Sequence, residues 1–429
     1  MISRKIYNLG KKLFPINRSI SGQGTLKTLK IIKKELPKLK IKKFKSSKKV
    51  FDWKIPSEWN VKKAFVLDKF NKKIIDINNN NLHLVGYSTP VKKIISKNNF
   101  LKKLHSLKKQ PNAIPYVTSY YKKYWGFCAS DLEKKNIIKN YKNHDKFFVN
   151  IESYFKKKGN LHYAELLIPG LSKKEILIST YICHPQMANN ELSGPLVSIG
   201  LIKYFLKKKN KKSLRFIFIP ETIGAIAYLK KNLKNLKKNI IGGYVLSCIG
   251  DEKNFSFIET KYGKTISDIA AVTAFKLLKL KFKKFKFLSR GSDERQFNSP
   301  GVDLPIASIL RTKYGEFKEY HTSLDNFKLV TLKGLKGGFD VVKKAIEIIM
   351  NFEIPKSTIL CEPMLKKKNL YNHLSIKNNK KKNLSKKILD FLQYSDGNNN
   401  LEQISKLIKI NLKETNKLFQ IAKKNNLVN

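Results

Sequence analysis

The sequence of 429 residues lacks the features that mark several classes of protein. Its first twenty residues contain no apolar stretch of the kind found in a secretion signal. No run of uncharged apolar residues approaches the length of about 18 that a membrane-spanning helix needs. We therefore expect neither a leader peptide nor a membrane span.

Cysteine is scarce, and the four cysteines lie far apart in the chain. They are Cys128, Cys183, Cys248 and Cys361. Because no CxxC pair occurs, the spacing excludes a zinc ribbon and a disulfide framework. The pattern favours a reducing compartment, and we expect a cytoplasmic protein.

Arginine is also rare, since only 6 of the 88 Lys and Arg residues are arginine. The formal net charge is +57, and the excess of lysine runs along the whole chain without a focus. A diffuse charge of this kind predicts salt-sensitive adsorption to polyanions, which does not require a dedicated nucleic-acid site.

What is present in the middle of the chain is an alternation of strand-like and helix-like segments. Apolar runs predict strands at 175–183, 214–220, 244–250 and 304–310. Helical spacing of apolar residues predicts helices at 193–208, 223–235, 266–280 and 333–352. This order predicts an α/β fold with a mainly parallel sheet and helices on both faces. Ligands bind such sheets beyond the carboxyl ends of the strands.

Three parts of the chain differ in composition. Residues 51–149 consist of short β-branched and aromatic pieces and predict an inserted β-rich domain, so that 1–50 and 150–355 form one discontinuous α/β domain. Residues 364–429 predict a polar linker to about 384 and then three short helices, the last two meeting at a tight turn near Asn411. These helices have the size of a winged helix-turn-helix domain. A homodimer through the insert is a further hypothesis.

Polar side chains follow the predicted strands and should therefore gather at one edge of the sheet. They are His184, Asn190, Glu191, Glu221, Arg290, Asp293, Arg295, Arg311 and His321. Glu221 ends an apolar strand, where desolvation would raise its pKa as a general base requires. The structural alternatives are a helix-capping loop around Asn190 and a favourable helix-dipole position for Glu221.

Three of the six arginines lie within 22 residues, at Arg290, Arg295 and Arg311. In a chain that otherwise uses lysine, this clustering favours bidentate binding of a carboxylate or phosphate. The alternative is an internal network with nearby acidic residues.

Several motifs together carry a family resemblance. They include LFPINRSISGQGT, AIPYVTSYY, STYICHPQMANNELSGP, IPETIG, RGSDERQF and EYHTS. On these motifs the whole chain resembles the aminopeptidase-like proteins of polysaccharide-biosynthesis loci, and more distantly the Streptomyces- and Aeromonas-type zinc aminopeptidases and the glutaminyl cyclases. The resemblance implies a zinc-exopeptidase-like sheet, an inserted β-domain and a C-terminal winged helix.

The resemblance also implies roles for individual residues. His184 and His321 fall on histidine ligands of the zinc aminopeptidases, and Glu221 falls on their general base. Three positions that carry carboxylate ligands in those enzymes hold other residues here, namely Asn190, Thr222 and Ser247. An intact two-zinc cluster is therefore not expected.

A single zinc site stays as the leading hypothesis. His184 and His321 would supply two ligands, with Glu191 or Asp293 as the third and Asn190 as a weak oxygen ligand. Asp293 would otherwise orient a ligand or hold a substrate amine. The arginines at 290, 295 and 311 would bind a substrate carboxylate or the oxyanion.

These assignments predict a metal-dependent hydrolase of a peptide or amide bond, with a small peptide-like or aminoacyl-sugar substrate in surface-polysaccharide or amino-sugar metabolism. A glutaminyl-cyclase-like aminoacyl transfer would use the same site. The alternative from another class is an inactive peptidase-fold protein that binds nucleic acid or protein through its winged helix, whose last helix carries several lysines.

Overall fold

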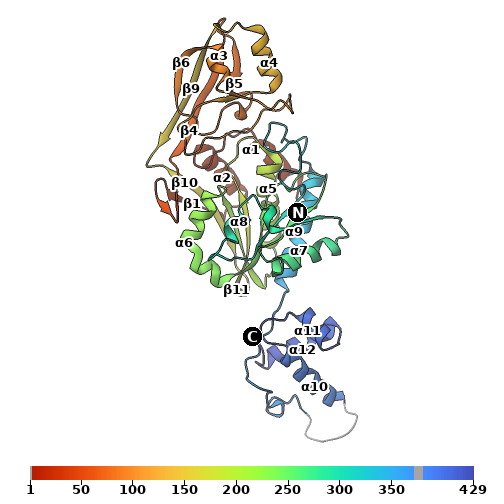
Figure 1. Ribbon diagram of the computed structural model, residues 1–429. Coiled ribbons are helices and arrows are strands. Elements are labelled where there is room, and N and C mark those ends of the chain that lie inside the picture. Colours follow the sequence, from red (N-terminus) through yellow and green to blue (C-terminus); the bar gives the residue numbers. More distant parts are fainter. Residues whose placement is uncertain (1, 372–379) are drawn as a thin grey trace. The chain divides into compact units, whose positions relative to one another are not determined.

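The computed structural model of this protein describes residues 2–371 and 380–429 (Figure 1). The chain divides into two units, Met1–Met350 and Asn351–Asn429. Each unit has its own hydrophobic core, and each is described by itself.

The first unit is built on an eight-stranded sheet with the order β1-β10-β12-β11-β13-β16-β14-β15. The four adjacent strands at its centre run parallel: β12 (Lys212–Ile219), β11 (Ser172–Tyr181), β13 (Ile240–Leu246) and β16 (Ile306–Leu310). The outer strands are β1 (Lys40–Lys45), β10 (Asn160–Ile168), β14 (Ser256–Ile258) and β15 (Lys283–Phe285), and β10 and β14 join the parallel core antiparallel. The predicted α/β fold with a mainly parallel central sheet is confirmed.

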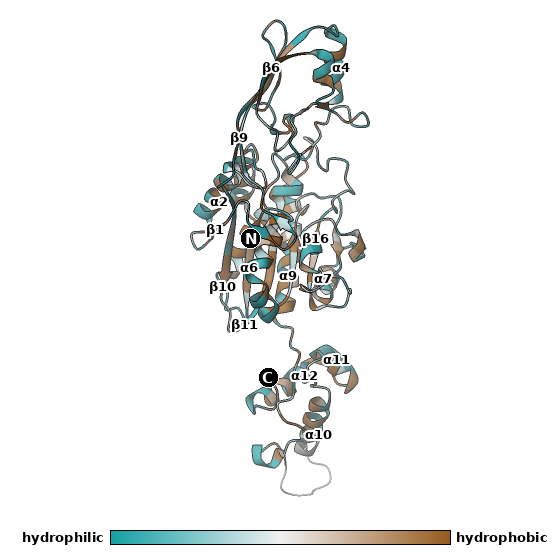
Figure 2. Cartoon of the chain, turned by 60° about the vertical axis from the view of Figure 1, so that its left-hand side comes forward, coloured by the Kyte–Doolittle hydropathy of each residue, from teal (hydrophilic) through white to brown (hydrophobic). Residues whose placement is uncertain are grey.

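Helices cover both faces of this sheet, because its central strands are apolar on both sides. One face packs against α1 (Arg4–Leu13), α2 (Gln23–Glu35), α5 (Ser193–Phe205), α7 (Ile266–Leu277) and α9 (Leu332–Met350). The other face packs against α6 (Ile223–Asn239) and the short α8 (Glu294–Phe297). Figure 2 shows the hydrophobic residues concentrated on the central strands. Among the helices that the structure describes, none is long and apolar enough to cross a membrane.

A second, four-stranded sheet lies within the predicted insertion and has the order β5-β4-β9-β6. Its strands are β4 (Glu58–Leu67), β5 (Lys73–Asp76), β6 (Val91–Ser96) and β9 (Lys146–Lys156). Smaller elements accompany it: η1 (Asn81–His83), α3 (Lys97–Leu101), β7 (Leu104–His105), β8 (Phe127–Cys128) and α4 (Asp131–Asn140). The hairpin of β2 (Lys49–Val50) and β3 (Trp53–Lys54) packs instead against α6 of the α/β part. The predicted boundary at 149 falls inside β9, which continues to Lys156 and leads directly into β10.

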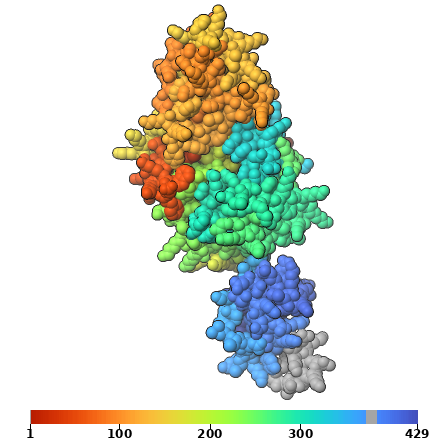
Figure 3. All heavy atoms as spheres, viewed as in Figure 1, coloured from red at the N-terminus to blue at the C-terminus, as the bar shows by residue number. Residues whose placement is uncertain are grey.

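The segment 114–120, which we call the strap, leaves the insert and lies against the α/β part. Pro115 forms a β-bridge with Thr322, and the Ile114 N–H donates to Ser323 Oγ at 3.0 Å. Figure 3 shows the orange insert packed on the cyan part of the chain that includes this contact. The sequence pattern predicted a β piece here, and the structure uses it as an extended connection between the two parts of the unit.

The second unit contains η4 (Leu365–Lys368), α10 (Lys380–Gln393), α11 (Leu401–Leu407) and α12 (Leu412–Lys424). Asn411 caps α12 by accepting from the Glu414 N–H at 2.9 Å, which confirms the predicted turn. The chain end pairs with the start of the unit through a bridge between Ser357 and Val428. The predicted linker is partly structured, since Leu365 is buried in the core of the unit. Residues 372–379 of that linker lie outside the described residues.

Gly194 provides a test of how tightly α5 packs on the sheet. A Cβ there would collide with the Leu246 carbonyl oxygen and with Thr180 Oγ1, and a backbone atom cannot move aside. We expect Gly194→Ala to lower the free energy of unfolding by about 2 kcal/mol or more. In Gly200→Ala, on the same helix, the nearest atom is the flexible end of Ile2 at 2.8 Å. The free energy of unfolding of that variant should lie within about 1 kcal/mol of the wild-type value. Urea titration of both variants checks this, and equal losses would contradict it.

Candidate active site

The loops that leave the carboxyl ends of β11, β12 and β16 bring predicted site residues together. His184 follows β11, Glu221 follows β12, and His321 lies in the loop after β16. His184 Nε2 lies 3.6 Å from Glu221 Oε2, and the rings of His184 and His321 have centroids 5.5 Å apart. The parallel order of these strands explains the convergence, because their carboxyl ends share one edge of the sheet.

A buried carboxylate fixes the direction of the His184 ring. His184 Nδ1 lies 2.8 Å from Glu191 Oε2, and Glu191 is buried in η2 (Ala188–Leu192), one turn of π-helix. Behind this pair, Arg18 Nε donates to the His184 carbonyl at 2.9 Å and lies 3.9 Å from Glu191 Oε1. Because Nδ1 is occupied, Nε2 is the nitrogen that faces Glu221.

The groups around His184 and its burial shift its pKa in opposite directions. Burial alone would lower the pKa of His184, but the Cys183 thiol and the Glu191 carboxylate raise it well above its ordinary value. The protonated or cation-bound imidazole is therefore the form that this environment stabilises.

Asp293 is fully buried and Glu221, whose side chain is 21% exposed, forms an acid pair with it; Glu221 is the member that faces Nε2 of His184. Burial raises the pKa of Glu221, and burial together with the Glu221 charge raises the pKa of Asp293 well above its ordinary range. Asp293 Oδ1 accepts from the Thr222 N–H at 2.8 Å, whereas its Oδ2 has no hydrogen-bond partner among the described residues. A proton or a metal cation at this place would relieve the repulsion.

Thr222, which lies next to Glu221 and contacts Asp293, has a strained backbone. Its φ of 60° and ψ of −82° are unfavourable for a β-branched residue. Its N–H is bound by Asp293, and its Oγ1 accepts from Arg295 Nη2 at 2.6 Å. Strain of this kind persists where the surrounding contacts over-determine it, typically at functional sites.

The strap closes the site on the side of the second histidine. The Tyr116 N–H donates to the His321 carbonyl at 2.9 Å, and the Tyr116 ring lies 5.3 Å from the ring of His184 and 5.2 Å from that of His321. Burial and the charge of His184 lower the pKa of His321 to about 3. His321 is therefore neutral at pH 7, which is the form that binds a metal.

Asn190, Thr222 and Ser247 stand where the resemblance would place carboxylate ligands, and the structure shows what surrounds each of them. Asn190 Oδ1 accepts from the Tyr181 hydroxyl at 2.8 Å, and the Asn190 N–H donates to Asp325 Oδ2 at 2.8 Å. Thr222 binds Asp293 and Arg295, as described above, and Ser247 is buried. A two-metal cluster does not fit this arrangement.

A single divalent ion fits better, and the structure offers two places for it. One group of three ligand-type side chains is close together in the described part of the chain: Cys183, His184 and Glu191, all buried. The permanent charge of Arg18 beside Glu191 disfavours a second cation there. On the Nε2 side of His184 the Glu221 carboxylate lies at 3.6 Å, and Asp293 and neutral His321 are more loosely placed, since among the described residues they do not belong to a group as compact as the first. There, Glu191 would play the supporting part usual for a carboxylate behind a metal-bound histidine.

The three predicted substrate-binding arginines lie in different surroundings. Arg295 contacts Thr222 beside the acids, and Arg290 is exposed on a neighbouring hollow with its guanidinium 4.9 Å from the centre of the Phe287 ring. Arg311 is buried, donates to the Asn254 carbonyl at 2.8 Å and stacks on Phe255. The structure therefore brings Arg295 to the site and gives Arg311 a packing role.

Sequence reasoning assigned no role to Arg18, Tyr116 or Asp325, although Asp325 lies in the same predicted loop as His321. Arg18 is one of only six arginines in a lysine-rich chain, and that rarity was a usable signal. Tyr116 reaches the site through a contact with a segment more than 200 residues later, and no local pattern predicts it. Asp325 holds the loop through the N–H groups of Asn189 and Asn190.

Comparison with known families agrees with this geometry. Residues 7–351 match the family model described as a domain of unknown function, DUF4910, and residues 353–429 match a winged helix-turn-helix model. The chain belongs to the DUF4910 family. It is 40% identical over 371 residues to a Clostridium acetobutylicum protein named as a candidate polysaccharide biosynthesis protein with an aminopeptidase-like domain, covering 86% of this chain and 83% of that protein.

Solved structures show the same fold. A candidate peptidase from Clostridium acetobutylicum is similar over 99% of this chain and 96% of that chain, with a TM-score of 0.81 and 36% identity. A zinc aminopeptidase from Bacillus subtilis is similar over 81% of this chain and 95% of its own, with a TM-score of 0.57 and 12% identity. A peptidase M28 precursor from Shewanella amazonensis gives a TM-score of 0.59 at 10% identity, over 84% of this chain and 95% of its own. The predicted aminopeptidase-like fold with a C-terminal winged helix is confirmed.

The contact between Arg18 and Glu191 should be a large contributor to stability. Replacing Arg18 with Met breaks one of the two buried contacts that balance the Glu191 charge and leaves the His184 imidazole as the other, and breaking a buried ion pair typically costs about 3–5 kcal/mol of unfolding free energy. The double variant Arg18→Met/Glu191→Gln removes that charge and should recover at least half of the loss.

Arg4→Met, at an exposed position of α1, serves as the control for the same chemical change. Urea unfolding of wild type, of these three variants and of the single variant Glu191→Gln measures the coupling. If Arg18→Met cost no more than Arg4→Met, the assigned pairing would be wrong.

Proposed function

We propose that this family member is a single-zinc hydrolase of a peptide or amide bond, with Glu221 as its general base. The observation that supports this most is the acid pair of Glu221 and Asp293, with Glu221 Oε2 3.6 Å from Nε2 of the oriented His184. Catalytic acids and bases are commonly found where burial and a like charge shift the pKa together.

The metal would be held on the Nε2 side by His184, His321 and Asp293. A zinc ion there would polarise the amide carbonyl as a Lewis acid. This donor set has two nitrogen atoms and one oxygen atom, which suits zinc. Asn190 and Glu191 would support the loop and the histidine.

The protein's own groups would then move the proton. Glu221 would accept a proton from the attacking water as the C–O bond forms, and it would deliver that proton to the amine as the C–N bond breaks. Arg295, held beside Glu221 by Thr222, would place positive charge near the developing oxyanion. The Tyr116 ring would shield the two histidines from bulk water.

The substrate would be a small peptide-like molecule or an aminoacyl sugar. Support comes from the aminopeptidase-like fold and from the name of the Clostridium relative, which refers to polysaccharide biosynthesis. An amino-acid-decorated amino sugar would satisfy both, because its amide bond is the kind that aminopeptidases hydrolyse.

A second candidate function is a binding protein that acts through its winged helix without catalysis. It is favoured by the replacement of three carboxylate ligands with Asn190, Thr222 and Ser247, two of which have partners of their own. The full chain would then bind duplex DNA with sequence preference, and it would hold no zinc.

Glu221→Gln tests the proposed base. Because the amide cannot accept the proton of water, we expect hydrolysis to fall by about 10²–10⁴-fold with little change in KM. Bound zinc should be unchanged, since Glu221 is not among the proposed ligands. A panel of aminoacyl anilides and N-aminoacyl amino sugars would provide the assay.

The control is Glu316→Gln, which makes the same change at an exposed position. It should hydrolyse the substrates at the wild-type rate. If Glu221→Gln also kept full activity, Glu221 would not be the base.

A further inference from the structure

A hollow of about 720 Å³ opens beside the proposed site and is rich in basic side chains. Its basic lining residues are Lys261, Lys286, Arg290 and Arg295. We propose that this hollow binds an oxyanionic group, a phosphate or a carboxylate, of the molecule that the protein hydrolyses. This deepens the proposed function and rests on it, because it names the class of substrate: an amide that carries an acidic group away from the scissile bond.

The two arginines of this hollow differ in their contacts from the buried or half-buried arginines elsewhere in the chain. Arg18 and Arg311 donate to backbone carbonyls, and Arg215 binds the carboxylates of Glu165 and Glu175. In the described part of the chain, Arg290 and Arg295 form no ion pair with a carboxylate. Arg295 faces the charges of Glu221 and Asp293 only beyond ion-pair distance. Two guanidinium groups on one hollow, neither of them engaged by a carboxylate, provide the planar donor pairs that bind oxyanions bidentately.

Arg295 connects the hollow to the chemistry. Its Nη2 donates to Thr222 Oγ1, next to Glu221, while its Nε is buried and has no hydrogen-bond partner among the residues described. A buried donor without a partner is costly, so the guanidinium of Arg295 has hydrogen-bonding capacity that its protein surroundings do not use. A substrate held there would place its amide bond near Glu221.

The acidic and apolar parts of the lining are consistent with this assignment. Glu259 contributes the carboxylate of the lining, and Lys284 at 2.8 Å and Lys286 at 3.4 Å compensate its charge. Leu288 also lines the hollow and is 83% exposed. It offers an apolar contact for the uncharged part of a bound molecule.

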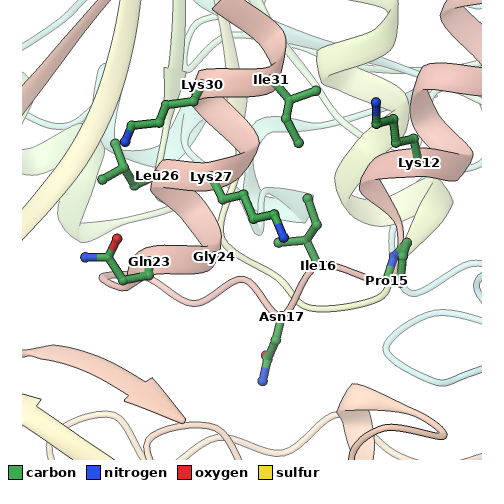
Figure 4. A pocket seen from close by; sticks show the side chains of 10 residues that line it. All are labelled: Lys12, Pro15, Ile16, Asn17, Gln23, Gly24, Leu26, Lys27, Lys30 and Ile31. Atoms are coloured by element: carbon green, nitrogen blue, oxygen red, sulfur yellow. The ribbon is translucent and has the colours of Figure 1, made fainter. Parts of the chain in front are cut away.

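A second hollow provides an internal comparison (Figure 4). It has a volume of about 610 Å³, lies between α1 and α2, and is lined by three lysines, Lys12, Lys27 and Lys30, and by no arginine. Figure 4 shows their amino groups pointing in different directions. This is the ordinary lysine surface of the protein, and it supplies a charge-matched control.

Isothermal titration of the full chain with inorganic phosphate and with glutarate, at constant ionic strength, tests the proposal. We expect saturable one-site binding of at least one of the two anions. Arg290→Lys keeps the charge but loses the bidentate fork, so it should weaken that binding about tenfold, or about 1.4 kcal/mol. Lys27→Gln should change it less than about twofold. Tighter binding of phosphate would assign a phosphoryl group to the substrate, and tighter binding of glutarate would assign a carboxylate.

Three outcomes would overturn the proposal: no saturable binding of either anion, wild-type binding by Arg290→Lys, or equal weakening by Lys27→Gln. The titration is separable from catalysis, because it can be repeated in Glu221→Gln. If the protein binds the anion but neither hydrolyses the substrates nor holds zinc, the anion site stands and the proposed hydrolase function is wrong. If it hydrolyses the substrates and holds zinc but binds neither anion, only the anion site is wrong.

Discussion

The buried ion pair of Arg18 and Glu191 determines which way His184 points, and the remainder of the site depends on that direction. Both side chains are fully removed from water, and the Glu191 charge is balanced by Arg18 at 3.9 Å together with the His184 imidazole at 2.8 Å. With Glu191 on Nδ1 and Arg18 on the main-chain carbonyl, the imidazole can present only Nε2 to the space beyond the sheet. Glu221 lies in that space, and the strained turn at Thr222 sets Asp293 beside it.

The same geometry explains how the site can do without the ligands that a metal pair needs. Asn190 and Thr222 carry no charge. The Asn190 side chain accepts a hydrogen bond from Tyr181, and the Thr222 side chain accepts one from Arg295. The negative charge is concentrated instead in Glu221 and Asp293, close to one histidine nitrogen. We propose that this site holds one cation. The strap from the insert lies over its two histidines through the Tyr116 ring.

Much of this could be predicted from the sequence, because local patterns carry the information. Apolar runs located the central strands, and the parallel order then placed His184, Glu221 and His321 at one edge. The tight turn near Asn411 was likewise predicted, from the place where the last two amphipathic helices meet. Contacts between distant segments could not be predicted in this way. The bridge between Pro115 and Thr322, and the pairing of Val428 with Ser357, depend on tertiary packing that leaves no local periodicity.

The central claim is that one metal ion is shared by the two histidines, and metal content measures it most directly. Elemental mass spectrometry of untagged protein should find about one zinc per chain in wild type, and little in His184→Ala or His321→Ala. His144→Ala, which removes an exposed histidine on the insert, should keep the wild-type content. A wild-type protein that stays free of metal after incubation with zinc would contradict the account and favour the binding-protein function.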